Sequence, residues 1–379
     1  MKILMCTDAM GYGGAETHIL SLCTQLKKLG HVVAVASPGG ELVNALMEAN
    51  IPHFSLPPIK KTPISLMKWR RKLKKIIRRC GFEVLHAHAR MPAFAAKPVV
   101  KKTKTLFVVT AHAKFRMDAV RRRLSVWGTR TIAVSEDIRA HIIKSCHLKR
   151  RRAREVSVIS NGVDTEKFYP AEQWRGVGHR IIFVSRLDND CALAARMLCK
   201  LAGKLSGVFP DVTITIVGGG SAYGEISVLA ELMNTACGRR VIIMKGAQED
   251  VASLLRQADV FVGVSRAALE AMACGLPVII AGDEGYGGIF VPHGGADHSN
   301  LCARRASVDS VDSVGGGGSV LSSDMLFDDV CRVLSLSVEQ KRQMGDALRE
   351  YVKLNYSAES SALRTVEVYR AAGKKRSKI

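Results

Sequence analysis

The feature that most constrains the fold is an alternation of short apolar runs and helical patterns, which continues through most of the 379 residues. Each run is rich in Val, Ile or Phe, is followed by a turn signal, and leads into apolar residues at helical spacing. Alternation of this kind is typical of parallel sheets covered by helices on both faces. The sequence therefore predicts an α/β protein of the doubly wound class.

The alternation falls into two series. Strand-like runs are predicted first at residues 3–7, 32–36, 52–56, 83–87, 105–110, 131–134 and 156–160, and then at 180–184, 212–217, 241–244, 260–264 and 278–281. Between the series, Asn161-Gly162-Val163-Asp164 is a turn signal, and a stretch containing Pro and Gly follows at 170–178. We therefore expect two Rossmann-like domains in tandem, residues 1–168 and residues 169–356.

The pattern stops from about Pro292 to Ser323, where Gly, Ser and Asp dominate and a flexible loop is predicted. Beyond this loop, Ser337 and Gln340 have the spacing of a capping box for a helix that reaches about Leu354. A last amphipathic helix is predicted at about 358–372.

Composition indicates a reducing compartment. The ten cysteines show no paired C-x-x-C spacing, and most lie inside apolar patterns, which favours buried thiols over disulfides or a metal site. The first seven residues resemble a strand rather than a secretion signal, and no window reaches the roughly 20 apolar residues of a membrane span. We therefore expect a cytoplasmic protein.

The charge is strongly positive: 56 Lys and Arg against 34 Asp and Glu, a net charge of +22. Much of the excess lies in the N-terminal half, notably in Lys68–Arg79, where Leu66, Trp69 and Leu73 follow helical spacing. Such a helix can lie on an anionic membrane surface, or it can pack its apolar face on the sheet and solvate its charges. Nucleic acid is a weaker third partner, because aromatic residues are few and no binding module is visible.

Asp259–Gly282 reads as strand, tight turn, helix and strand. Leu269, Met272 and Ala273 have the spacing of a helix face against a sheet, and Gly275 is a natural helix terminator. Glu270 lies early in this helix, where a carboxylate can reach a ligand held above the C-terminal ends of parallel strands. The alternative is a solvated surface glutamate.

Glycine loops and cations follow several predicted strands. Gly11–Glu16, with Gly13 and Gly14, can bring backbone N–H groups close to an anion, although a tight turn needs glycine anyway. A nicotinamide site would add an acid after the second strand, where Ser37-Pro38 stands instead, and this argues against a dehydrogenase. Arg186, directly after a strand, can clamp a diphosphate. The same position after later strands is taken by Gly218 and Gly219 and by Lys245 and Gly246.

His112 ends another strand, where a neutral imidazole can hydrogen-bond a ligand, although a histidine in this position is usually structural; His86 and His88 are weaker versions of the same arrangement. Asp188-Asn189-Asp190 has the Asp-x-Asp pattern that elsewhere binds a divalent metal. In this position we predict that it caps a helix beginning near Cys191, and we predict no metal site.

Glu270–Ile279, EAMACGLPVI, resembles the donor-nucleotide signature of GT-B glycosyltransferases of family 4. The resemblance implies that Glu270 binds the ribose of a nucleotide sugar. It further implies that Arg186, Gly218, Gly219, Lys245, Gly246, Ser265 and Arg266 line the donor site, with the loop at Gly13 and Gly14 and with His112 at the sugar. Two positions depart from the family pattern: Val262 stands where a first Glu is expected, and Cys191 stands where a second phosphate-binding Lys is expected, so that Arg266 is a possible substitute.

The resemblance implies a retaining, metal-independent glycosyltransferase without a cofactor, with His112, Arg186 and Glu270 as its catalytic residues. In the family the terminal helix crosses back to the N-terminal domain, so we assign 357–379 to that domain. The implied donor is a nucleotide sugar, with uridine diphosphate favoured. The implied acceptor is a hydroxyl of a glycan or lipid-linked precursor in cell-surface polysaccharide synthesis, at the inner face of the membrane. The alternatives are a nucleotide-sugar epimerase of the same fold and a non-catalytic relative that binds nucleotide or membrane.

Overall fold

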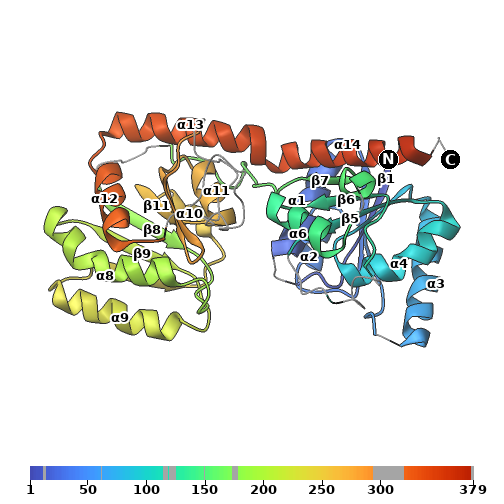
Figure 1. The fold of residues 1–379 in the computed structure, drawn as a ribbon, viewed down its shortest axis with the longest axis horizontal. Helices are drawn as coiled ribbons and strands as arrows, with labels where there is room; N and C mark the ends of the chain where they lie inside the picture. The colour runs from blue at the N-terminus through green and yellow to red at the C-terminus, as the bar shows by residue number, and fades with distance from the viewer. Residues whose placement is uncertain are drawn as a thin grey trace. The chain divides into compact units, whose positions relative to one another are not determined.

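The computed structural model describes residues 1–11, 14–60, 62–113, 118, 125–148, 150–172, 178–292 and 320–376 (Figure 1). The chain forms two compact units, Met1–Gly162 with Tyr356–Ile379, and Val163–Asn355. Each unit is built on one sheet of mainly parallel strands, so the predicted class of two Rossmann-like domains is confirmed. The boundary between the two units follows Gly162, inside the predicted turn. The sequence analysis placed this boundary after residue 168.

The N-terminal unit contains a seven-stranded sheet in the order β3-β2-β1-β4-β5-β6-β7. Its parallel strands are β1 (Lys2–Cys6), β2 (Val32–Ser37), β3 (His53–Ser55), β4 (Val84–Ala87), β5 (Leu106–Ala111), β6 (Arg130–Ala133) and β7 (Val156–Val158). The chain proceeds outward from β1 on one side and from β4 on the other. The strand order therefore reverses between β1 and β4, and such a reversal is where open α/β sheets bind ligands.

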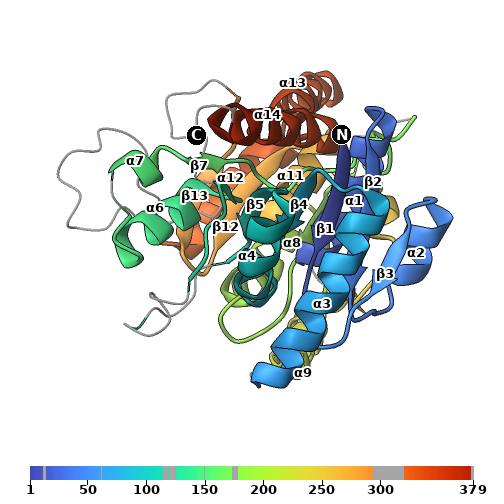
Figure 2. The same cartoon turned by 90° about the vertical axis from the view of Figure 1, so that its right-hand side faces the viewer.

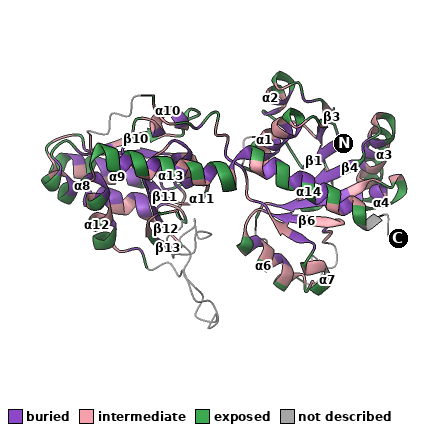
Figure 3. Cartoon of the chain, turned by 90° about the horizontal axis from the view of Figure 1, so that it is seen from above, coloured by how far each residue is buried: buried purple, intermediate pink, exposed green. Residues whose placement is uncertain are grey.

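Helices cover both faces of this sheet (Figures 2 and 3). They are α1 (Gly14–Lys28), α2 (Val43–Glu48), α3 (Pro63–Cys80), α4 (Arg90–Thr103), α6 (Glu136–Ser145), α7 (Arg150–Ala153) and α14 (Ala358–Arg376). Residues alternate along β1: Ile3 and Met5 join the core under α1 and α14, whereas Leu4 and Cys6 join the core under α3 and α4. The terminal helix α14 thus packs on the N-terminal unit, as expected.

The basic helix α3 uses its apolar stripe in the core. Trp69, Leu73 and Ile77 are buried against the sheet, and most of the Lys and Arg residues are exposed. Arg70 differs, since its Nε donates to the Ala95 carbonyl of α4 at 3.0 Å. Thr62 caps the helix start by accepting from the Ser65 N–H, and Gly81 ends it in the left-handed conformation. The apolar stripe is therefore packed on the sheet, and membrane binding by the exposed basic face stays a prediction. Among the described residues, we find no helix with the length and hydropathy needed to cross a bilayer.

A buried histidine joins α14 to the sheet. Nδ1 of His86 on β4 lies 2.7 Å from the Tyr369 hydroxyl of α14, and Nε2 lies 2.7 Å from Oγ1 of Thr110 on β5. All three residues are buried. Burial lowers the pKa of His86 to about 3, so the imidazole is neutral and each ring nitrogen has a hydrogen-bonding partner.

The second unit has a six-stranded sheet in the order β10-β9-β8-β11-β12-β13. The strands are β8 (Arg180–Val184), β9 (Thr213–Val217), β10 (Ile242–Gly246), β11 (Val260–Gly263), β12 (Val278–Gly282) and the antiparallel β13 (Gly285–Ile289). The order reverses between β8 and β11. Strand β13 was not predicted, because three of the five residues in GYGGI are glycine, which is depleted in strands.

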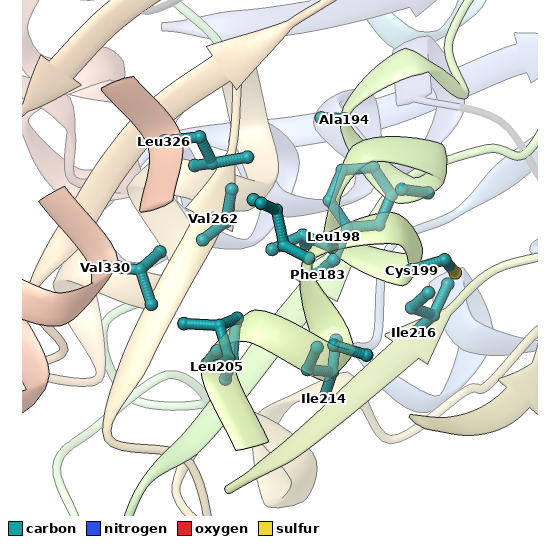
Figure 4. Packing of buried hydrophobic residues seen from close by; sticks show 14 of the residues in the cluster. Phe183, Ala194, Leu198, Cys199, Leu205, Ile214, Ile216, Val262, Leu326 and Val330 are labelled. Carbon is teal, nitrogen blue, oxygen red and sulfur yellow. The ribbon is translucent and has the colours of Figure 1, made fainter. Parts of the chain in front are cut away.

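The helices of this unit are α8 (Leu193–Val208), α9 (Tyr223–Ala236), α10 (Val251–Leu255), α11 (Ser265–Ala273), α12 (Ser323–Leu334) and α13 (Val338–Tyr356). Figure 4 shows Leu198 of α8, Leu326 of α12 and Val262 of β11 in one core. The sequence analysis missed α12. The capping box of α13 is confirmed, since Ser337 and Gln340 exchange backbone-to-side-chain hydrogen bonds of 2.9 and 3.2 Å. The predicted loop at 292–323 falls mainly on residues 293–319, outside the described residues.

The end of α11 is held tightly by α13. Gly275 has φ +74°, its N–H donates to the Met272 carbonyl at 2.9 Å, and the helix stops there as predicted. A Cβ added to Gly345 of α13 would lie 1.9 Å from the Gly275 carbonyl oxygen, so only glycine allows the two backbones to approach this closely. Arg349, one turn further along α13, donates to the Ala273 carbonyl and, at 3.0 Å, to the Phe168 carbonyl. A cation thereby binds the negative end of α11.

Gly345→Ala should destabilise the second unit by about 2 kcal/mol or more, because the added methyl group overlaps the Gly275 backbone. Gly203→Ala is the matched control: Gly203 is an exposed residue of α8 with no atom near the added Cβ, and the substitution should stabilise the protein by about 0.5–1 kcal/mol. Calorimetric unfolding measures both variants. Equal stability of the two variants would show that α13 does not contact the end of α11 in this way.

Acid should destabilise the N-terminal unit through His86. The unfolded imidazole binds a proton below pH 6.5, whereas the folded one does so only near pH 3, so the free energy of unfolding falls as pH falls through this window. From pH 6.5 to 4.5 the loss due to His86 should be about 2 kcal/mol. Urea unfolding at both pH values should show that the free energy of unfolding depends less on pH in His86→Gln than in wild type. An unchanged dependence would contradict the buried neutral state.

Candidate active site

The loops that follow β8, β9 and β11 meet at the strand-order reversal of the second unit. Strands β8 and β11 are parallel neighbours, and so are β8 and β9, so their carboxyl ends lie at one edge of the sheet. Arg186 follows β8, Gly218 follows β9, and Ser265 follows β11 after one intervening residue. Three of the predicted site segments are therefore brought together at the position where ligands of open α/β sheets bind.

Arg186 projects from this edge, and its side chain is 73% exposed. Its Nη1 donates to Asp188 Oδ2 at 3.0 Å, and its Nη2 lies 3.8 Å from Cys191 Sγ. The other oxygen of Asp188 accepts from the Ser221 N–H at 3.0 Å, which ties the loop after β8 to the loop after β9. Asp188 therefore positions Arg186, while the guanidinium remains open to an external anion.

The predicted role of Asp188-Asn189-Asp190 as a helix cap is wrong. Helix α8 begins at Leu193, and its N-cap Ala192 makes no side-chain cap hydrogen bond. Instead, both oxygens of Asp283 accept from the Leu193 N–H, at 3.2 and 3.3 Å. Asp283 follows β12, ninety positions further along the chain, and nothing in the local sequence pattern points to this contact. The positive end of α8 is thus already occupied by a carboxylate.

Two of the glycines after β9 allow the loop after β9 to pass close to the loop after β8. A Cβ added to Gly218, at φ +142°, would lie 1.8 Å from the Ser185 carbonyl oxygen, and one on Gly220 would lie 2.6 Å from the Leu187 carbonyl oxygen. These two positions are glycine because the loop after β9 passes directly against the loop after β8. At Gly219 the nearest atom to an added Cβ is 3.7 Å away, so a side chain at this position would meet no steric clash.

Lys245 and Gly246 end β10, on the far side of β9 from β8. The Lys245 side chain is exposed, and its carbonyl accepts from Gln248 Nε2 at 2.7 Å. The Gly246 carbonyl accepts from the Gly218 N–H at 2.8 Å. This pair therefore borders the glycine loop without belonging to the group around Arg186.

Helix α11 carries a second cationic group at the same edge of the sheet. Its N-cap Val264 makes no side-chain cap hydrogen bond, and Ser265 has φ +62°, an uncommon conformation for a residue other than glycine. Arg266 Nε donates to Glu270 Oε1 at 2.8 Å. The Arg266 Nη1 atom is buried and has no partner among the described residues. The predicted residues Ser265, Arg266 and Glu270 thus lie together on the first turns of one helix.

The position of Val262 in the fold accounts for its departure from the family signature. It is fully buried in β11 within the core shown in Figure 4, so it cannot correspond to a ligand-binding carboxylate. Strand β11 ends at Gly263 and α11 begins at Ser265, which confirms that the loop between them is short.

The N-terminal unit carries the predicted histidine one strand away from its strand-order reversal. His112 follows β5, and its Nε2 lies 3.1 Å from Nδ1 of His88, which follows β4. The Nδ1 atom of His112 is buried and has no hydrogen-bonding partner in the described part of the chain. Burial lowers the pKa of His112 to about 4 and lowers that of His88 well below its usual value, so both rings are neutral.

The glycine loop is only partly described. Gly13 lies outside the described residues, and Gly14 is the exposed first residue of α1. After β1, burial and the nearby Glu16 raise the pKa of Asp8. In the described ranges no group of three or more His, Cys, Asp or Glu side chains is arranged to hold a metal ion.

Comparisons with known proteins cover both units. The sequence model of Glycosyltransferase Family 4 matches residues 12–167, and that of Glycosyl transferases group 1 matches residues 178–305. The chain is 28% identical over 291 residues to a phosphatidyl-myo-inositol mannosyltransferase of Mycolicibacterium smegmatis, covering 70% of this chain and 72% of the relative. It is 23% identical over 283 residues to an Escherichia coli UDP-Gal:alpha-D-GlcNAc-diphosphoundecaprenol alpha-1,3-galactosyltransferase, covering 66% and 71%.

Solved structures share the fold at full length. A glycosyltransferase from Rickettsia africae has a TM-score of 0.74 at 19% identity, with 98% of each chain covered. Anabaena Alr3699/HepE in complex with UDP has a TM-score of 0.69 at 15% identity, with 100% of each chain covered. Because the two sequence models match both units and the fold agrees along the whole chain, this protein belongs to the family 4 glycosyltransferases of the GT-B fold.

Proposed function

We propose that the protein is a retaining glycosyltransferase that takes a sugar from a uridine diphosphate carrier and attaches it to a hydroxyl of a lipid-linked glycan precursor. The observation that carries the donor assignment is the pair of guanidinium groups at the β8–β11 reversal. Arg186 is exposed, and Arg266 has a buried Nη1 without a partner in the described structure. Two adjacent cations at this edge fit a diphosphate.

The helix termini support the same assignment. The positive end of α8 is filled by Asp283, whereas the start of α11 has no side-chain cap. Backbone N–H groups at such a start, together with the helix dipole, favour a bound phosphate. In this proposal the diphosphate binds between Arg186 and the first turn of α11, and Arg266 replaces the phosphate-binding lysine whose position is taken by Cys191.

The nucleoside is held by neighbouring groups. One carboxylate oxygen of Glu270 accepts a hydrogen bond from Arg266. The remaining lone pairs of the carboxylate can accept hydrogen bonds from ribose hydroxyls. The base lies near Lys245 and Gly246, and Gly219 leaves room beside the phosphates. The chemistry rests on positioning and on stabilising the negative charge of the departing diphosphate, which two guanidiniums and a helix terminus can supply without a metal ion.

The acceptor is proposed from the relatives and from helix α3. The mycobacterial relative is named for phosphatidyl-myo-inositol, and the Escherichia coli relative for a diphosphoundecaprenol-linked sugar. On α3 a groove of about 590 Å³ has Phe54 and Ile76 among its lining, together with five basic side chains, Lys68, Arg71, Lys72, Lys75 and Arg79. Ile64 and Met67, near the start of α3, are exposed. We propose that this surface binds anionic lipid at the inner face of the membrane.

Arg186→Ala should weaken UDP binding roughly ten- to hundredfold, because a charge-assisted hydrogen bond to phosphate contributes about 1.5–3 kcal/mol. Glu270→Ala should weaken binding of UDP more than that of inorganic pyrophosphate, because only UDP carries ribose. Arg342→Ala, on the exposed surface of α13, removes the same charge from the unit and should leave affinity unchanged. Calorimetric titration measures all three variants. Unchanged affinity in both Arg186→Ala and Glu270→Ala would show that the donor site lies elsewhere.

A quadruple substitution of Lys68, Arg71, Lys72 and Lys75 to Glu should abolish sedimentation with vesicles that contain anionic lipid, since each basic residue contributes about 1 kcal/mol. Wild-type binding should weaken as salt rises. Lys101→Glu with Lys102→Glu, at the exposed end of α4, is the control and should retain most of the binding. Binding that ignores both salt and the quadruple substitution would exclude α3 as the membrane contact.

A further inference from the structure

A polar cavity lies at the edge of the second sheet opposite to Arg186. Its volume is about 550 Å³, and all of its lining residues belong to the second unit, among them Tyr169, Glu172, Arg180, Ser253, Arg256 and Gln257. Arg180 is the first residue of the five-residue strand β8, whereas Arg186 follows the end of the same strand. A strand of this length spans roughly 17 Å, so the cavity is distinct from the proposed donor site.

Arg180 is held in place by a buried carboxylate. Its Nε and Nη2 donate to Oδ2 and Oδ1 of Asp259 at 2.8 and 3.1 Å, and its backbone N–H donates to Oδ2 at 2.9 Å. Asp259 is fully buried and directly precedes β11, the parallel neighbour of β8. This double contact fixes the plane of the guanidinium. The third nitrogen, Nη1, has no partner among the described residues, so its N–H groups are available to a ligand.

Arg256 supplies a second guanidinium to the same cavity. Its Cζ lies 4.5 Å from the centroid of the Tyr169 ring, and its Nη2 donates to Ser253 Oγ at 3.0 Å. Its Nη1 lies 3.5 Å from the Lys167 carbonyl oxygen. In the described part of the chain, Nε has no partner. The stacking and the hydrogen bond therefore restrain this side chain and still leave an N–H group for a ligand.

A third cation is buried beside Arg180. Lys341 of α13 is 2% exposed, and its side chain makes no hydrogen bond within the described ranges. Burial lowers the pKa of Lys341, the nearby Asp259 acts in the opposite direction, and Arg180 adds to the lowering. The carboxylate of Asp259 is therefore shared by two cations. A bound anion would balance the positive charge that Asp259 leaves uncompensated.

The remaining lining groups are acceptors. The Glu172 carboxylate has no partner in the part of the chain that the structure describes. Gln257 donates from Nε2 to the Ser253 carbonyl at 3.1 Å, which leaves its Oε1 as an acceptor. Hydroxyl groups can donate to both acceptors, whereas a bare phosphate is repelled by the Glu172 charge. Two guanidiniums together with two acceptors fit a ligand that carries both a phosphate and hydroxyl groups.

We propose that this cavity binds a sugar phosphate, with the phosphate at Arg180 and Arg256 and the sugar hydroxyls at Glu172 and Gln257. The cavity and the donor edge lie at opposite ends of β8. A ligand bound here therefore does not compete with UDP, and the proposal does not depend on the proposed function.

Calorimetric titration of the full-length protein with glucose 1-phosphate, glucose 6-phosphate and inorganic phosphate tests the site. At least one of the two sugar phosphates should bind tenfold or more tightly than inorganic phosphate. Arg256→Ala should weaken that binding roughly ten- to hundredfold, because it removes a charge-assisted hydrogen bond to the phosphate. Arg180 is a poorer choice for substitution, since its loss would leave Asp259 buried without its partner. Arg332→Ala, at a 70% exposed position of α12, removes the same charge from the unit and should bind as wild type does.

Glu172→Ala separates the two parts of the ligand. It should strengthen the binding of inorganic phosphate, because a like charge is removed, and weaken that of the sugar phosphate, because a hydroxyl acceptor is removed. Binding of the sugar phosphate that weakens no more than that of inorganic phosphate would contradict the hydroxyl contact.

Arg186→Ala distinguishes this cavity from the donor edge and should leave the affinity for the sugar phosphate unchanged. Loss of binding in Arg186→Ala would place the ligand at the donor edge and overturn the proposal. No binding of either sugar phosphate, or binding that Arg256→Ala leaves unchanged, would overturn it as well.

Discussion

Parallel strand pairing determines where chemistry can occur in this protein. Because β8 runs parallel to β9 on one side and to β11 on the other, the segments that follow all three strands leave the sheet at the same edge. Arg186 and the first turn of α11 are neighbours for this reason, although 80 residues separate Arg186 from Arg266 in the chain. The hydrogen bond from Ser221 to Asp188 and the glycine crossing at Gly218 then fix these loops against each other.

The fold was predictable because its signals are local and repeated. Each strand followed by a helix has its own apolar pattern, and the capping box at Ser337 and the terminator at Gly275 act within one helical turn. Of the two elements that were missed, only β13 lacks such signals: it is a glycine-rich edge strand that is regular because it pairs with β12. Helix α12 has a Ser322 N-cap and buried residues at helical spacing, and it was missed because the loop predicted at 292–323 extends over its start.

For the site, the sequence could predict which residues follow the ends of strands, but not which contacts these residues make. The sequence indicated Arg186, Glu270 and His112, but it could not show that Asp188 ties two loops together or that Asp283 fills the start of α8. Both contacts join residues distant along the chain, and acidic residues are common in loops for many reasons. His88 was seen as a weak candidate, and only the structure shows that its ring nitrogens lie 3.1 Å from His112 Nε2 and 3.4 Å from Met5 Sδ.

The return of α14 to the first unit has a consequence for biosynthesis. Val366, Tyr369 and Ala372 complete the hydrophobic layer over β1 and α1, yet they are synthesised after every residue of the second unit. The second unit uses only residues 163–355, so its chain is complete earlier. Domains normally mature from the N-terminus during translation. Here the order is inverted, because the first unit cannot cover its apolar layer until α14 has been synthesised, after the whole of the second unit.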